Sequence, residues 1–98
     1  MIVLKKIIFT DLDGTLLDHQ TYSFEKAKDA LQLIKEKGIP LICCTSKTRA
    51  EIEHWRDELQ NTHPFISENG GGIFIPRGYF DFDFSYNKKD IEYFRYEF

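Results

Sequence analysis

Three apolar stretches, each followed at once by polar residues, constrain the fold of this sequence more than any other feature. We expect them to be strands over Val3–Thr10, Leu41–Cys44 and Phe65–Ser67. Unbroken apolar strands are typical of a parallel sheet that is covered on both faces. Helical patterns lie between the stretches and supply the crossovers that parallel strands need. The sequence therefore predicts an α/β fold, a Rossmann-like parallel sheet with flanking helices.

Two helices are expected between these strands. Ser23 is a predicted N-cap of the first helix, and Gly38 follows its predicted end. The second helix begins after Thr48, which has capping-box spacing to Glu51. The predicted buried positions are Ala27, Ala30, Leu31 and Ile34 in the first helix and Ile52, Trp55 and Leu59 in the second.

The C-terminal part is predicted to contain smaller β elements. Ile73–Ile75 is a candidate hairpin partner of the third strand, and Tyr79–Phe84 alternates apolar with acidic residues as a strand does. The segment from Asn87 onward is expected to begin a helix. Nine aromatic residues lie within positions 79–98, which is many rings for a small chain to bury. This aromatic C-terminal segment is a candidate surface for a homo-oligomer or a complementing chain.

Composition excludes several classes of protein. The net charge of −3 argues against nucleic-acid binding. The apolar stretches are too short for a membrane span or a signal peptide. The adjacent Cys43 and Cys44 lie inside an apolar run and are a poor disulfide pair, so we expect a cytoplasmic protein.

Asp11 and Asp13 form the most informative polar cluster. Two carboxylates leaving a strand at this spacing repel each other unless a cation joins them, and Mg²⁺ prefers such oxygen ligands. Gly14 gives the turn unusual backbone angles, and the NH groups exposed by such a turn can bind an anion. A plain Asp-Gly turn explains Asp13 and Gly14 but leaves Asp11 unexplained.

A second polar cluster, Thr45, Ser46 and Lys47, follows the second strand and precedes a helix. The Thr45 hydroxyl, the helix N-terminus and the Lys47 cation suit a phosphate group. Glu68 and Asn69 open a third cluster, which we interpret first as a turn. Ligands of open parallel sheets lie beyond the carboxyl ends of the strands, so the three clusters are expected to meet there.

The stretch IIFTDLDGTLLD resembles the first motif of the haloacid dehalogenase-like (HAD) phosphatases, and LICCTSKT resembles their second. SKTRAE together with ENGG is similar to the mannosyl-3-phosphoglycerate phosphatase branch. The resemblance implies that Asp11 is the nucleophile and that Asp13 is the general acid and base. It implies further that both residues hold Mg²⁺, Asp11 through its carboxylate and Asp13 through its backbone carbonyl. It also implies a small phosphorylated sugar or glycerate as substrate, with an aspartyl-phosphate intermediate.

The same resemblance implies two further motifs, a lysine and an acidic metal ligand, that lie beyond a cap domain. Residues 1–76 are expected to form the N-terminal part of the core, and residues 77–98 the incomplete start of the cap. Two alternatives stay open. The chain is a phosphatase for another sugar phosphate, such as sucrose phosphate or phosphomannose, or it is a catalytically inactive fragment that serves as a binding or oligomerising module.

Overall fold

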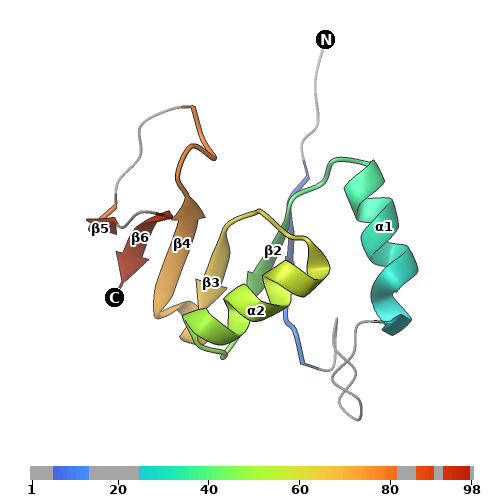
Figure 1. The fold of residues 1–98 in the computed structure, drawn as a ribbon, viewed down its shortest axis with the longest axis horizontal. Coiled ribbons are helices and arrows are strands. Elements are labelled where there is room, and N and C mark those ends of the chain that lie inside the picture. Colours follow the sequence, from blue (N-terminus) through green and yellow to red (C-terminus); the bar gives the residue numbers. More distant parts are fainter. Residues whose placement is uncertain (1–5, 14–24, 82–85, 90–91, 98) are drawn as a thin grey trace.

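The computed structural model describes residues 6–13, 25–81, 86–89 and 92–97 (Figure 1). Within these ranges strands alternate with helices in the first two thirds of the chain. The elements, in chain order, are β1 (Ile8–Thr10), η1 (Glu25–Ala27), α1 (Lys28–Glu36), β2 (Leu41–Cys44), α2 (Arg49–Leu59), β3 (Phe65–Ser67), η2 (Glu68–Gly70), β4 (Gly72–Pro76), β5 (Lys88–Lys89) and β6 (Tyr93–Glu97).

The strands of the described residues form a six-stranded sheet of order β1-β2-β3-β4-β6-β5. The first three strands are parallel, with Ile8 beside Leu41 and Cys43 beside Phe65. The last three are antiparallel to their neighbours. The predicted α/β class is confirmed, and the hairpin expected at Ile73–Ile75 is strand β4. The sheet is mixed rather than wholly parallel because tight turns after β3 reverse the chain.

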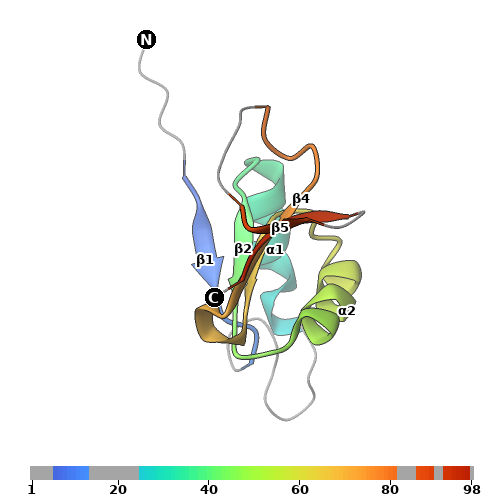
Figure 2. The same cartoon turned by 90° about the vertical axis from the view of Figure 1, so that its left-hand side faces the viewer.

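Both helices lie on the same side of the sheet (Figure 2). This follows from the strand order, since β1, β2 and β3 are added in one direction and right-handed crossovers then put every helix on one face. α2 covers the sheet closely, whereas α1 buries none of its side chains fully. The helices therefore form one layer against one face of the sheet.

The hydrophobic core lies between α2 and the sheet. Phe65 and Phe74 stack with their ring centroids 4.8 Å apart, and Tyr93 meets Phe65 edge-on. The predicted anchors Trp55 and Leu59 pack against this core. The buried core residues are Leu12, Cys43, Ile52, Phe65, Phe74 and Tyr93.

The helix ends follow the local sequence. Thr48 and Glu51 form the predicted capping box at the start of α2. Gly38 follows the C-cap of α1 with a φ of +66°, a conformation that glycine adopts without strain. The predicted N-cap Ser23 lies outside the described residues, and α1 begins after Ala27 without a side-chain cap.

The prediction of a helix from Asn87 onward is wrong. Tyr93–Glu97 is strand β6, and it pairs with β4 along its length. Burial of Tyr93 decides this, because its hydroxyl accepts a hydrogen bond of 3.0 Å from the buried Arg56 and its ring joins the core. The strand predicted over Tyr79–Phe84 does not form at Tyr79–Asp81, and the rest of it lies outside the described residues.

Within residues 6–13, 25–81, 86–89 and 92–97, no helix has the length and apolar character needed to cross a bilayer.

Candidate functional site

The first two polar clusters meet at the carboxyl edge of the parallel strands. Thr10 at the end of β1 lies beside Cys43 of β2, so the residues that follow each strand are neighbours. Asp11 and Asp13 come from the segment after β1, and Thr45 and Lys47 from the segment after β2. The structure thus brings together the two clusters that the sequence placed at strand ends.

Asp11 is exposed, and its Oδ1 accepts a hydrogen bond of 2.8 Å from the backbone N–H of Leu12. Leu12 is fully buried in the core and fixes the backbone between the two aspartates. One carboxylate oxygen of Asp11 is therefore hydrogen-bonded to the backbone, and the side chain is exposed to solvent. Within residues 6–13, 25–81, 86–89 and 92–97, no lysine or arginine forms an ion pair with Asp11.

Asp13 lies next to Lys47. The Lys47 Nζ is 3.3 Å from Asp13 Oδ2, and the aspartate side chain is about one third exposed. Its other oxygen, Oδ1, is buried and has no hydrogen-bond partner among the described residues. A buried carboxylate oxygen without a donor is costly, so a cation or a donor brought by a ligand would satisfy it.

Lys47 is itself held by a second carboxylate. Its Nζ lies 3.8 Å from Glu51 Oε2, and its side chain is only 16% exposed. Hydrogen bonds from Thr48, together with the Lys47 charge, lower the pKa of the Glu51 carboxyl group. From the sequence, Glu51 is predicted only as part of the helix cap. Its i, i+4 spacing from Lys47 is the signal that would have revealed its second contact.

Thr45 and Ser46 differ in accessibility. Thr45 is 2% exposed, and its Oγ1 accepts a hydrogen bond of 3.3 Å from the Lys47 backbone N–H. Its hydroxyl hydrogen is left to donate to another acceptor. Ser46 is exposed at the same edge. Gly14, the remaining predicted phosphate contact, lies outside the described residues.

The third cluster is hydrogen-bonded to the second. The Glu68 backbone N–H donates to the Lys47 carbonyl at 3.0 Å, and the Asn69 backbone N–H donates to the Thr45 carbonyl at 2.9 Å. Both residues have positive φ, 51° and 55°; this conformation is strained for Glu68, whereas asparagine tolerates it. The turn after β3 thus fixes the backbone of the segment from Thr45 to Lys47.

The donor set at this edge fits Mg²⁺ in part. Asp11 supplies an exposed carboxylate, and Asp13 can add its backbone carbonyl oxygen. The described residues contain no group of three or more acidic, histidine or cysteine side chains that would hold a metal. Mg²⁺ often keeps several waters and takes only one or two carboxylates, so two aspartates suit it as a partial site.

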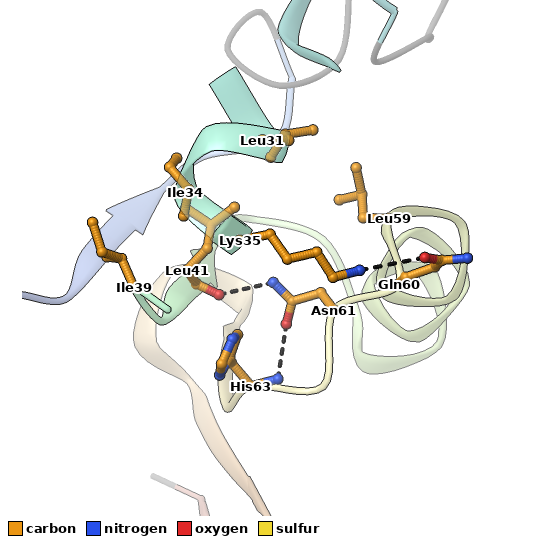
Figure 3. A pocket seen from close by; sticks show the side chains of 9 residues that line it. All are labelled: Leu31, Ile34, Lys35, Ile39, Leu41, Leu59, Gln60, Asn61 and His63. Atoms are coloured by element: carbon orange, nitrogen blue, oxygen red, sulfur yellow. Dashed lines mark hydrogen bonds between the residues drawn. The ribbon is translucent and has the colours of Figure 1, made fainter. Parts of the chain in front are cut away.

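A pocket between α1 and α2 lies at the opposite end of the strands (Figure 3). It measures about 70 Å³ and adjoins Leu41, the first residue of β2. Its polar groups are largely paired, since Lys35 donates to Gln60 and Asn61 donates to the Leu41 carbonyl. None of the predicted site residues lines it. It is best explained by the loose packing of α1.

Comparison with known sequences matches the chain over residues 8–94 to haloacid dehalogenase-like hydrolases. It is similar to the glucosyl-3-phosphoglycerate/mannosyl-3-phosphoglycerate phosphatase of Methanococcoides burtonii, with 66% identity over 80 residues covering 82% of this chain and 29% of that protein. The mannosyl-3-phosphoglycerate phosphatase of Pyrococcus horikoshii is 49% identical over 78 residues, which are 80% of this chain and 31% of that protein. The chain therefore spans about three tenths of the length of these relatives.

Solved structures share the fold. A hypothetical protein of Geobacillus kaustophilus matches with a TM-score of 0.64 and 32% identity, over 76% of this chain and 28% of that one. The HAD subclass IIB sugar phosphatase BT4131 matches with a TM-score of 0.60 and 25% identity, over 72% of this chain and 28% of that one. From the sheet, the residues at its carboxyl edge and the match over residues 8–94, this chain belongs to the haloacid dehalogenase-like hydrolases.

Proposed function

We propose that this chain carries the nucleophile and the acid–base residue of a Mg²⁺-dependent phosphatase that acts on a sugar-phosphate-type monoester. The substrate that we propose is mannosyl-3-phosphoglycerate, which would be hydrolysed to mannosylglycerate. The observation that carries the proposal is the meeting of an exposed Asp11 with Asp13 and Lys47 at the carboxyl edge of the sheet. The names of the relatives from M. burtonii and P. horikoshii support the substrate class.

In the proposed reaction an Asp11 oxygen attacks phosphorus and forms an aspartyl-phosphate. The bond from phosphorus to the sugar or glycerate oxygen breaks, and Asp13 gives its proton to that oxygen. Asp13 then takes a proton from water, the water oxygen attacks phosphorus, and the bond to Asp11 breaks to release phosphate. Mg²⁺, if held by the Asp11 carboxylate and the Asp13 backbone carbonyl, would neutralise charge on the transferring phosphoryl group.

The remaining residues of the site are proposed to bind substrate. Gly14, Thr45, Ser46 and Lys47 would contact the phosphate through NH groups, hydroxyls and one ammonium group. Lys47 has a second task in this proposal, because its contact with Asp13 orients the carboxylate that moves the proton. Residues 1–76 would belong to the core and residues 77–98 to the start of a cap. We expect the enzyme to work in the cytoplasm, in keeping with two unpaired cysteines.

Phosphate release tests the proposal directly. The protein is incubated with mannosyl-3-phosphoglycerate, glucosyl-3-phosphoglycerate, sucrose phosphate or phosphomannose, with Mg²⁺ or with EDTA. We expect release from the first two substrates only, loss of release in EDTA, and loss in Asp11→Asn. Lys35→Met, on α1 and away from the site, is the matched control. Equal turnover in the Asp11→Asn protein would overturn the assignment of the nucleophile.

A second candidate function is a catalytically inactive module that binds or oligomerises through its aromatic C-terminal segment. The exposed rings of Phe80, Tyr86 and Tyr96 favour it. It predicts no phosphate release from any substrate and a dimer by analytical ultracentrifugation. Tyr86→Ser together with Tyr96→Ser would dissociate that dimer.

A further inference from the structure

Glu51 makes two different contacts in the first turn of α2, one with each carboxylate oxygen. Its Oε1 accepts hydrogen bonds from the Thr48 backbone N–H at 3.3 Å and from the Thr48 hydroxyl at 3.0 Å. Its other oxygen, Oε2, lies 3.8 Å from the Lys47 ammonium nitrogen. The capping box requires only the contacts with Thr48. Helix capping therefore leaves the contact with Lys47 unexplained.

The backbone of Lys47 is fixed without any help from Glu51. Its N–H donates to the Thr45 hydroxyl oxygen at 3.3 Å, and its carbonyl oxygen accepts from the Glu68 N–H at 3.0 Å. These bonds fix where the lysine side chain starts but not where it ends, because the ammonium group sits on a flexible aliphatic stem. The position of the ammonium group thus depends on the carboxylates that it contacts.

Two carboxylates of unequal rigidity hold this ammonium group. The Lys47 Nζ lies 3.3 Å from Asp13 Oδ2 and 3.8 Å from Glu51 Oε2, and the lysine side chain is only 16% exposed. Glu51 is anchored by its hydrogen bonds from Thr48. In the part of the chain that the structure describes, the Asp13 side chain has no hydrogen bond or ion pair besides the one with Lys47. The anchored end of the series is therefore Glu51, and the end that needs orienting is Asp13.

We propose that Glu51 is a positioning residue for the reaction, because it holds the Lys47 ammonium group against Asp13 and so orients the Asp13 carboxylate. This inference rests on the proposed function, in which Asp13 moves the proton. A group that gives a proton to one oxygen and takes it from another must stay within hydrogen-bond reach of both. A carboxylate that turns away from that position slows the chemical step, whereas substrate binding does not depend on it.

One substitution separates this role from helix capping. Glutamine is as suitable as glutamate at the third position of a capping box. Glu51→Gln therefore keeps the cap and removes the charge that faces Lys47. Glu53→Gln is the matched control, because it removes an equal charge from the same helix, where the carboxylate pairs with Arg49.

Steady-state phosphate release from mannosyl-3-phosphoglycerate in Mg²⁺ is the first measurement. Glu51 is about half exposed, and an ion pair of this kind corresponds to a change of at most about fivefold. We expect kcat to fall about three- to fivefold in Glu51→Gln, with KM equal or lower. Glu53→Gln should keep both constants, and all three proteins should unfold at the same urea concentration. Unchanged kcat in Glu51→Gln would overturn the inference.

The second measurement needs no turnover, so it separates this inference from the proposed function. NMR relaxation gives the order parameter of the Lys47 Cε–H bonds, and the Asp13 Cγ resonance reports on the surroundings of that carboxylate. We expect the order parameter to fall and the Asp13 resonance to shift in Glu51→Gln, with neither change in Glu53→Gln. An equally ordered Lys47 without the Glu51 charge would overturn the inference, even if Asp11→Asn abolishes phosphate release. If Lys47 loosens as expected and no protein releases phosphate, the proposed function fails and Glu51 remains the residue that orients Asp13.

Discussion

The ammonium nitrogen of Lys47 lies 3.3 Å from the Asp13 carboxylate, and this ion pair joins the two sequence motifs that end β1 and β2. Lys47 is mostly buried and is held from its other side by Glu51. The contact connects a residue proposed to move protons with the first turn of α2. It therefore makes the position of Asp13 depend on the capping of that helix.

Replacing Lys47 by methionine should impair the proposed phosphatase reaction. A hydrogen bond to a charged group contributes about 1.5–3 kcal/mol, which corresponds to a roughly ten- to hundredfold change in rate. We expect phosphate release to fall by that factor in Lys47→Met and to recover in part in Lys47→Arg. Steady-state rates in Mg²⁺ measure both. If Lys47→Met retains full kcat and KM, the ion pair has no part in the reaction.

The strained turn after β3 should respond to the shape of the side chain at Glu68. This residue has a φ of 51°, and the left-handed conformation costs residues other than glycine about 1–2 kcal/mol. Glu68→Val should lower the free energy of unfolding by about 1 kcal/mol or more, because β-branched residues tolerate this conformation least. Glu68→Gly should leave it equal or higher, since relief of strain offsets the entropy of glycine. Urea denaturation measures the free energy of unfolding of both variants. An equal loss of stability in both would contradict the backbone strain proposed at Glu68.

Stability should fall at mildly acidic pH because of His63. Burial, with a smaller contribution from the Arg56 charge, lowers the pKa of His63 below its ordinary value of 6.5. The unfolded chain therefore takes up the proton first as the pH falls. The free energy of unfolding decreases as the pH falls from about 6.5 to the folded-state pKa of His63. His63→Gln should flatten this part of the profile. His54→Gln, an exposed control on α2, should keep it.

The two cysteines should differ in reactivity. Cys43 is 1% exposed, and burial raises its pKa to about 11, so almost no thiolate is available near neutral pH. Cys44 points to the other face of the sheet and is only partly buried. In the folded protein iodoacetamide should modify Cys44 long before Cys43, as mass spectrometry of the peptides would show. Rapid labelling of Cys43 without unfolding would contradict its place in the core.

The sequence determined the local features of the protein. The second and third strands, the second helix and its Thr48–Glu51 cap depend on neighbours along the chain, and each formed where predicted. The residues proposed for the site were also chosen from sequence, because polar side chains after parallel strands share one edge of a sheet. The roles given to Asp11, Asp13 and Thr45 stay predictions.

Only the tertiary structure decided how distant segments combine. The C-terminal segment is a strand rather than a helix because Tyr93 enters the core and bonds to Arg56, 37 residues earlier in the chain. The Lys47–Asp13 pair likewise joins segments that sequence spacing leaves independent. The placement of α1 and α2 on one face of the sheet depends on the order of the strands. Long-range packing of this kind selects among conformations that are locally similar in energy, so no short window of sequence determines it.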